Sequence, residues 1–547
     1  MNKFKTNFTG VFYFVLWMFI FSILSYAIIL KFYNVIAYNI PREFREMTTV
    51  KFALDFSNGS NPYALSLLEQ DQPFPTTMYG FLVPLILSPF VKLSALFHVG
   101  SALQVCEIVT LCVELLGILF FYLTVQRKLH SHTLSILGSL FLYACFWRYS
   151  PIGGAFPDQF GVTLSVFLLF LLTQDEQKRK YHPIAYSLIL IILFYIKQYF
   201  LFLALGLFFY LWLSDSIKTA LKFALSGILC GSISLFFVHV IFPLYFTEIL
   251  PIAQGQTTAN DFLYSFMQVI RLTGKSFLPV FLAMVSAIIM AVFLSIKTGE
   301  FHMDGFCSIK PGTKWKISYE LFQVFCMFPL VFYISQNTGT IYTYYLQLWI
   351  PYVILSGIMA IHYFLAVCRD KAPNRNPVYV ILPLLFLLSA FFTKKWTISP
   401  VPDTPEIENW NTAYQILNQY SDEDGNILVS PHLSNFCLEN GIYTAEYGQA
   451  EFNSLENYEN WDSHLIWHDF FPYAGDIIMK NLDYNAKVLE GISQGRFSCI
   501  AITRTANYEL PFDTLTDSVG NCPYDLLTTL TLSTGTQEWE TYFYIRK

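Results

Sequence analysis

Residues 39–90 read NIPREFREMTTVKFALDFSNGSNPYALSLLEQDQPFPTTMYGFLVPLILSPF, and this stretch decides how the rest of the chain is interpreted. It opens with the carboxylates Glu43 and Glu46. Apolar residues at helical spacing then predict a helix over 47–56. Asn58-Gly59 ends that helix as a C-cap, because both residue types accept a left-handed conformation. The stretch therefore begins as a polar segment with a short helix of its own.

A membrane helix is predicted directly before this stretch. The apolar run at 10–32 is about 23 residues long, which is enough to cross a bilayer and too long for the core of a signal peptide. No small-residue cleavage site follows the run, so the helix is expected to be retained. Lys3 and Lys5 place its start in the cytoplasm. Residues 33–77 are then a polar loop on the outer face.

Composition extends this interpretation to most of the chain. Of its 547 residues, 54% are hydrophobic and 13% are charged, whereas about 25% of residues are charged in a soluble domain. Much of the surface is therefore solvated by lipid, which predicts a multi-pass integral membrane protein. The net charge of −6 argues against a nucleic-acid partner, since binding to phosphates needs a basic face.

Further apolar runs, which continue to about residue 392, predict a polytopic helical bundle. Basic residues in the short loops between the runs mark the cytoplasmic side. The segment 78–97 contains Pro84 and Pro89, and counting it as a span would place the basic Gln126-Arg127-Lys128 outside. We therefore expect a proline-broken, re-entrant or juxtamembrane segment there. The count is then about eleven helices, with the N-terminus in the cytoplasm and the C-terminus outside.

The chain changes character after residue 395, where a proline-rich segment indicates a linker. We expect a membrane domain at 1–395 and a soluble extracytoplasmic α/β domain at 396–547. The elements expected in the second domain are helices at 406–420 and 482–494 and strands at 426–430, 497–503, 526–533 and 538–545, the last two forming a hairpin around Thr534-Gly535.

The order of features in residues 39–90 resembles that of GT-C glycosyltransferases, the multi-helix membrane enzymes that use polyprenyl-phosphate sugars. In those enzymes an acidic residue opens the first outer loop, and a helix, a glycine-containing turn and a tyrosine-led segment at the membrane surface follow. Glu46, Gly59, Asn61-Pro62-Tyr63 and residues 79–84 stand in that order here. The similarity is greatest to bacterial aminoarabinose and O-mannosyltransferase-like members. It implies a mainly α GT-C bundle with a C-terminal α/β domain in a bacterial inner membrane.

Three later motifs agree with this resemblance in order and in side of the membrane. Phe156-Pro157-Asp158 is similar to the Arg-Pro-Asp of these families, although no arginine precedes the proline. Lys197-Gln198 lies at the outer end of a predicted helix, like the Lys-Gln or Lys-x pairs found there in these families. The element at 344–351, YYLQLWIP, resembles a late Arg-Tyr-Leu-Leu-Pro-Leu element, with a tyrosine in place of the arginine.

The resemblance implies transfer of a sugar from a polyprenyl-phosphate carrier to a glycan, lipid or protein acceptor on the extracytoplasmic face. Such a transfer needs a base for the acceptor proton and cations for the leaving phosphate. Glu46 is the expected base or metal-assisted activator, with Glu43 as the alternate, and Asp158 is expected to position the acceptor or bind a cation. The structural alternatives are a first-turn carboxylate for Glu46 and a helix N-cap for Asp158.

Substrate contacts are expected from basic, amide and aromatic residues on the outer side, namely Lys197, Gln198, Arg271, Lys275, Tyr63, Tyr79, Tyr344 and Tyr345. Lys197 lies in a strongly apolar run, where an ionisable group is costly and indicates function. Its alternative is snorkelling to the interface, and solvated loop charges and an aromatic belt are the alternatives for the other cations and tyrosines. No metal ligand is assigned, and dependence on a divalent cation (Mg, Mn or Ca) stays open.

Other interpretations stay open beside this one. A secondary transporter fits the composition, although no internal repeat is evident. A lipid-linked polysaccharide polymerase or ligase differs mainly in the acceptor. Asp462, His464, His468 and Asp469 form a cluster that is interpreted as a solvated segment in preference to a metal site. The outward soluble domain and the long first loop favour an enzyme over a transporter.

Overall fold

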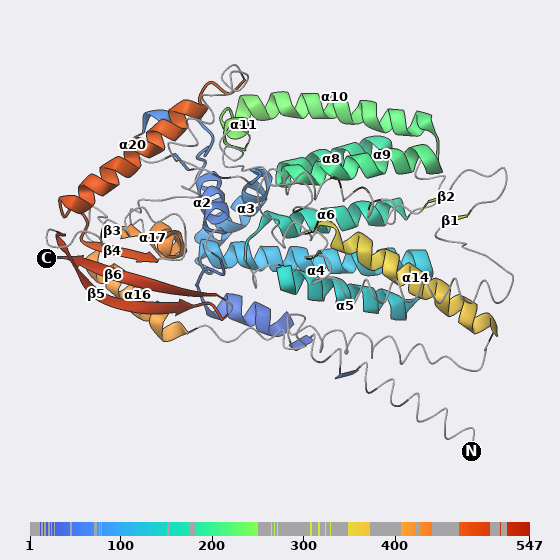
Figure 1. Ribbon diagram of the computed structural model, residues 1–547, viewed down its shortest axis with the longest axis horizontal. Coiled ribbons are helices and arrows are strands. Elements are labelled where there is room, and N and C mark those ends of the chain that lie inside the picture. Colours follow the sequence, from blue (N-terminus) through green and yellow to red (C-terminus); the bar gives the residue numbers. More distant parts are fainter. Residues whose placement is uncertain are drawn as a thin grey trace.

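The computed structural model describes residues 28–43, 46–70, 74–75, 77, 79–149, 154–173, 182–249, 348–371, 406–421, 427–439, 470–503, 522–535 and 537–547, together with short or isolated positions outside these ranges. These residues form a helical bundle with a small mixed sheet beyond one end of it (Figure 1). The architecture is mainly α, as the sequence predicts. The expected domain boundary near residue 395 lies outside the described residues.

The apolar helices of the bundle lie side by side along the long axis of the molecule (Figure 1). They are α4 (Ala102–Leu129), α5 (His132–Tyr149), α6 (Pro157–Leu172), α8 (Pro183–Ile196), α9 (Leu203–Ser214), α10 (Ile217–Ile241) and α14 (Ile350–Lys371). Among the described residues, α4 and α10 are long and apolar enough to cross a membrane. Only 6% of the most apolar window of α10 is buried, so this helix lies at the edge of the bundle, where it packs against α8 and α9.

The ends of α4 follow from local sequence. Ser101 and Gln104 form a capping box at its start, in which each side chain accepts a hydrogen bond from the backbone N–H of the other residue. Arg127 and Lys128 lie in the last turn, where positive charge offsets the negative end of the helix dipole. His130 then takes a left-handed conformation, with φ of 49°, and ends the helix.

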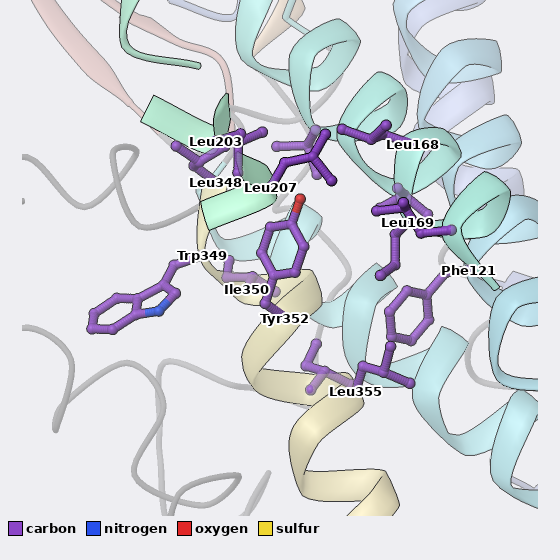
Figure 2. Close-up of a cluster of buried hydrophobic side chains, with 14 of the residues drawn as sticks. Phe121, Leu168, Leu169, Leu203, Leu207, Leu348, Trp349, Ile350, Tyr352 and Leu355 are labelled. Carbon is purple, nitrogen blue, oxygen red and sulfur yellow. The ribbon is translucent and has the colours of Figure 1, made fainter. Parts of the chain in front are cut away.

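The main hydrophobic core lies between α4, α6, α9 and α14 (Figure 2). Tyr352 and Leu355 of α14 lie in this core together with Leu207 of α9 and Phe121 of α4, and all four side chains are fully buried. Inside a membrane such side chains hold helices together by van der Waals packing, because lipid tails are as apolar as leucine. The core therefore fixes the mutual placement of the helices whose ends carry the site described below.

The segment after the first membrane helix forms α2 (Glu46–Ser57), the 3₁₀ helix η1 (Leu65–Glu69) and α3 (Leu82–Phe97). The predicted helix and its glycine C-cap are confirmed, since Gly59 has a φ of +80°. α3 is one continuous helix with Pro89 inside it, so of the three expected alternatives the proline-broken one is excluded, and a re-entrant or juxtamembrane placement stays a prediction. Its 16 residues extend about 24 Å, less than the ~30 Å hydrocarbon core of a bilayer.

A four-stranded sheet in the order β3-β4-β6-β5 forms the C-terminal part of the fold. β3 (Ile427–Val429) is parallel to β4 (Cys499–Thr503), whereas β6 (Glu538–Arg546) is antiparallel to both β4 and β5 (Tyr524–Ser533). The predicted hairpin is confirmed, and Gly535 takes a φ of +83° in its turn. Helices α16 (Ile407–Tyr420), α17 (Ser434–Glu439) and α20 (Ala474–Ser493) accompany the sheet. Other short elements are η2 (Gln198–Phe202), α11 (Tyr245–Thr247), β1 (Cys307–Ser308), β2 (Lys316–Ile317) and η5 (Pro431–Leu433).

The sheet contacts the start of the segment 38–77, which follows the first predicted membrane helix. Ile40 is buried in the same core as Trp410 of α16 and Phe543 of β6. The hydroxyl of Tyr414 donates a hydrogen bond to the carbonyl of Asn39 at 3.1 Å. The chain therefore passes from the bundle into the first loop along the C-terminal sheet, which brings residues far apart in sequence to one end of the bundle.

Candidate active site

Glu46 is the first residue of α2, and its carboxylate accepts hydrogen bonds from the backbone of two separate loops. The amides of Arg42 and Glu43 donate to Oε1, the second at 3.2 Å. The amide of Ala155 donates to Oε2 at 2.9 Å. The side chain is fully buried. Glu46 therefore joins the segment before α2 to the loop that precedes α6.

Burial also changes the acidity of this residue. It raises the pKa of Glu46 from its ordinary value of 4.5 to about 7, although three amide donors and the charge of Arg42 act in the opposite direction. A carboxyl group with this pKa exchanges its proton near neutral pH, which suits a general base. Glu43, the predicted alternate, is buried as well, and its carbonyl accepts a hydrogen bond from the amide of Glu46 at 3.3 Å.

Arg42 places a buried positive charge beside Glu46. Its Nη2 atom donates to the carbonyls of Asn34 and Tyr38, at 2.7 Å and 3.3 Å, where the preceding helix ends. Its Nε atom lies 3.4 Å from Oε1 of Glu107 in α4. Glu107 is fully buried. Glu107 was not predicted as a site residue, although a carboxylate inside an apolar run is by itself a signal of function.

A second buried ion pair lies two helical turns further along α4. Nζ of Lys31 is 2.8 Å from Oε2 of Glu114, and both side chains are 2% exposed. Glu107 and Glu114 are seven residues apart and so lie on one face of the helix. Together with Arg42, these ion pairs hold the helix Ile28–Ala37 and the start of the segment after it against α4.

Asp158 and Lys197 form a buried ion pair at the ends of two helices. Asp158 lies in the first turn of α6, and Lys197 is the residue at which α8 ends. Nζ of Lys197 lies 3.0 Å from both carboxylate oxygens of Asp158. The hydroxyl of Tyr199 donates a hydrogen bond to the same carboxylate. Both charged residues were predicted from sequence and the structure brings them together, whereas Tyr199 was not predicted.

The chain before α3 runs past this ion pair. The ring centroid of Tyr79 lies 4.9 Å from Nζ of Lys197, which is a cation–π distance. The N–H of Gly80 donates to the carbonyl of Ile196 at 3.2 Å. A Cβ atom on Gly80 would lie 1.8 Å from the carbonyl oxygen of Tyr195, so no larger residue fits here. Tyr79 therefore borders the ammonium group, as a substrate-contacting role would require.

The remaining predicted substrate residues have different surroundings. Gln198 is half-buried at the start of η2, next to Lys197. Tyr63 is fully buried, and its ring centroid lies 5.4 Å from that of Tyr245. Arg271 is exposed. Lys275, Tyr344, Tyr345 and the acidic-histidine cluster at 462–469 lie outside the described residues.

A further buried carboxylate, Glu248, was not predicted. It follows α11 and is fully buried. The backbone of Thr77 donates towards this carboxylate, whereas the nearby hydroxyls of Tyr63 and Tyr245 have no hydrogen-bond partner among the described residues. Burial raises the pKa of Glu248 well above its ordinary range. Sequence offers no signal that separates it from an ordinary loop carboxylate.

The fit of a divalent cation to these side chains is poor. Among the residues that the structure describes, no group of three or more His, Cys, Asp or Glu side chains is placed to hold a metal ion. Oε1 of Glu46 accepts two amide hydrogen bonds and Oε2 accepts one, so a metal ion on Oε1 would have to displace an amide, and Oε2 has room for one further partner. No step of the chemistry below is therefore assigned to a metal at Glu46.

The bundle, the short helices α2, η1 and α3, and the C-terminal sheet together make up a fold that solved structures share. The fold is similar to that of ArnT from Cupriavidus metallidurans bound to undecaprenyl phosphate, with a TM-score of 0.56 and 10% sequence identity, over 96% of this chain and 97% of that chain. This likeness confirms the GT-C fold expected from residues 39–90.

Two further solved structures are also similar. ArnT from C. metallidurans in the apo state has a TM-score of 0.49 at 10% identity over 96% of this chain and 97% of that chain. The archaeal oligosaccharyltransferase AglB from Archaeoglobus fulgidus, in complex with an inhibitory peptide and a dolichol-phosphate, has a TM-score of 0.45 at 10% identity over 89% of this chain and 69% of that chain. No protein-family model and no curated protein sequence matches the chain.

Proposed function

We propose that this protein is a membrane glycosyltransferase that moves a sugar from a polyprenyl-phosphate carrier to a glycan, lipid or protein acceptor on the extracytoplasmic face. The observation that carries the proposal is the fold shared with ArnT over nearly the full length of both chains. The ArnT structure contains undecaprenyl phosphate. The buried Asp158–Lys197 pair beside Tyr79 supports the same function, because a buried lysine can stabilise a phosphate that leaves with negative charge.

The proposed placement in the membrane follows from the charge pattern and the apolar helices. The bundle is a polytopic one of about eleven spans, with the N-terminus in the cytoplasm and the C-terminal sheet outside. In that orientation the first outer loop, Asp158 and Lys197 share the extracytoplasmic side. A bacterial inner membrane is the proposed location, since undecaprenyl phosphate is the carrier seen in the similar ArnT structure.

The reaction forms one bond and breaks one. An acceptor oxygen attacks the anomeric carbon of the sugar, and the bond between that carbon and the phosphate oxygen breaks. The electron pair of the broken bond stays with the phosphate, and Lys197 stabilises the resulting charge. Asp158 holds the Lys197 ammonium in place through two contacts of 3.0 Å.

Glu46 takes the proton that the acceptor oxygen loses. Its pKa of about 7 makes it a competent base at neutral pH, because a large share of the molecules carry the ionised form. Oε2 accepts one amide hydrogen bond, from Ala155, and a carboxylate oxygen can accept a second. The same amide bonds fix the carboxylate in one orientation, which a base needs as much as a suitable pKa.

The test is consumption of a lipid-linked sugar by the purified protein in lipid nanodiscs. A bacterial membrane lipid extract supplies polyprenyl-phosphate sugars, and mass spectrometry follows the release of polyprenyl phosphate. The proposal predicts release by the wild type and a loss on the order of 10²- to 10⁴-fold in Glu46→Gln. Asp55→Asn is the matched control, because Asp55 is another carboxylate of α2, paired with Lys51 near the surface.

Three outcomes separate the proposal from its alternatives. Wild-type release that falls in Glu46→Gln and persists in Asp55→Asn supports it. Movement of the lipid-linked sugar across a bilayer without any cleavage would show a transporter instead. Equal release by the wild type and Glu46→Gln would support the proposed glycosyltransferase activity but would show that Glu46 is not its base.

A further inference from the structure

The segment that leads to Tyr79 contains a backbone that needs partners from elsewhere. Phe74 stands between Pro73 and Pro75, and proline has no backbone N–H, so Phe74 supplies the only amide donor of this triplet. A residue before proline is held in an extended conformation. Phe74 is buried, and a buried N–H or C=O without a partner is costly. The triplet therefore depends on a partner outside its own loop.

Asn481 of α20 supplies both missing partners. Its Oδ1 accepts a hydrogen bond from the amide of Phe74 at 2.6 Å, and its Nδ2 donates to the carbonyl of the same residue at 3.0 Å. The two residues are 407 positions apart. Asn481 is 4% exposed. One side-chain amide thus pairs with the loop backbone in the way that a neighbouring strand would.

Other residues of α20 hold the same part of the first outer loop. Nζ of Lys480 donates to the carbonyl of Leu68 at 3.3 Å and to that of Gln70. Ala474, Ile477 and Ile478 are buried in one cluster with Phe74, Phe81, Tyr195 and Tyr245. The helix therefore contacts η1 and the segment after it through hydrogen bonds and through hydrophobic packing. Figure 1 shows α20 crossing from the sheet towards α11 at the end of the bundle.

The C-terminal end of the segment that α20 contacts lies at the candidate active site. The segment at 74–80 is held at its start by Asn481 and at its end by Gly80, whose N–H donates to Ile196 at 3.2 Å. Between these points the ring of Tyr79 lies against the Lys197 ammonium. A shift at Phe74 would therefore move Tyr79 relative to Lys197.

We propose that Asn481 is a positioning residue of the donor site, through which α20 sets the 74–80 segment against Lys197. This inference rests on the proposed function, since it assigns the C-terminal part of the chain a role in the same site. The partner group is the phosphate of the lipid carrier, which meets Lys197 and Tyr79 in the arrangement that α20 imposes. Misplacement of a site element by about 1 Å can cost on the order of 10²-fold in rate.

The experiment compares Asn481→Ala with Asn485→Ala in the full-length protein in nanodiscs. Asn485 is the same residue type, half-buried one turn further along α20, and serves as the matched control. Hydrogen exchange followed by mass spectrometry measures protection of the amides at 74–80 and, separately, of β4 and β6. Binding of undecaprenyl phosphate and release of polyprenyl phosphate from the lipid-linked sugar pool are measured on the same samples.

The expected result is faster exchange at 74–80 in Asn481→Ala with unchanged exchange in the sheet. Release should fall on the order of 10- to 100-fold, and Asn485→Ala should behave as the wild type. Faster exchange at 74–80 with unaltered binding and release would overturn the positioning role. Unaltered exchange at 74–80 would show that Asn481 does not hold this segment. If the wild type neither binds undecaprenyl phosphate nor releases it from the sugar pool, the proposed function fails. The exchange comparison still shows whether Asn481 holds the 74–80 segment.

Discussion

Asp158 and Lys197 meet with Nζ of the lysine 3.0 Å from each carboxylate oxygen, at the points where α6 begins and α8 ends. The residues are 5% and 4% exposed. A buried ion pair adds little to stability as a pair, but removal of one partner leaves a buried unpaired charge that costs about 3–5 kcal/mol. The pair is therefore best explained by a need for positive charge at this position.

A double-mutant cycle on this pair separates stability from binding. Lys197→Met and Asp158→Asn should each lower the thermal unfolding midpoint, and the double variant should recover part of the loss because neither charge is left alone. Affinity for undecaprenyl phosphate should fall about tenfold or more in Lys197→Met and in the double variant, which corresponds to the loss of a charge-assisted contact. It should persist in Asp158→Asn, measured by ligand binding in nanodiscs. Equal affinity in Lys197→Met and the wild type would remove Lys197 from the phosphate site.

Glu46 predicts a pH dependence of stability with a defined sign. Its pKa rises from 4.5 to about 7 on folding, so the folded protein retains a proton that the unfolded chain releases between these values. This contribution is fully present below about pH 4.5 and is lost as pH rises through about 7, a total on the order of 3 kcal/mol. Thermal unfolding of the wild type should lose stability across this window. Glu46→Gln should show a flatter profile, and a profile parallel to the wild type would contradict the assignment.

Gly80 and Gly231 form a matched pair for the close approach beside Tyr79. Alanine at Gly80 would place its Cβ 1.8 Å from the Tyr195 carbonyl oxygen, whereas alanine at Gly231 in α10 meets nothing within 4 Å. Gly80→Ala should lower stability by about 1–3 kcal/mol or more and reduce polyprenyl phosphate release. Gly231→Ala should keep both, since alanine is the better helix former. Comparable behaviour of the two variants would mean that the Gly80 contact is not tight.

Glu248 predicts a stabilising substitution at high pH. Its pKa is raised well above the ordinary range by burial, so its favourable contribution is present in acid and is lost as pH rises through the raised pKa. Glu248→Gln keeps the shape without the ionisable group. The variant should unfold at a higher temperature than the wild type at pH 8, and the difference should shrink towards pH 5. A difference that does not vary with pH would show that ionisation of Glu248 does not matter to stability.

The fold was predictable where local patterns carry it. The C-terminal strands and α16 were predicted from alternation and helical spacing, and α2 was predicted together with its glycine cap. A proline break in α3 was one of three predicted alternatives, and the structure excludes it. Pro84 lies in the first turn of α3, where the missing N–H has no partner within the helix, and Pro89 is accommodated without ending it.

The start of α20 shows what sequence pattern alone does not reveal. A helix was predicted from residue 482, whereas the structure begins it at Ala474. The added residues carry Gly475 and the consecutive Ile477 and Ile478, which do not follow the spacing of a surface helix. They are buried against the first outer loop, which is a contact between residues about 400 positions apart that no local window contains.

In the candidate site, individual charged residues were predictable from sequence, whereas the contacts between them were not. Glu46, Asp158 and Lys197 were predicted individually because charged groups at membrane depth or at an outer-loop start are informative. Their connections were not predictable. The amide of Ala155 binds Glu46, and Asp158 three residues later binds Lys197, so one short loop connects the two charged groups. These contacts depend on how α2, α6 and α8 pack, and packing is not encoded in a motif.

The most direct test of the account is a structure of the protein in nanodiscs with undecaprenyl phosphate bound. The account predicts a phosphate oxygen within about 2.7–2.9 Å of Nζ of Lys197, beside the ring of Tyr79 and on the same side of the bundle as Glu46. A phosphate bound elsewhere, with Lys197 still paired with Asp158, would contradict it.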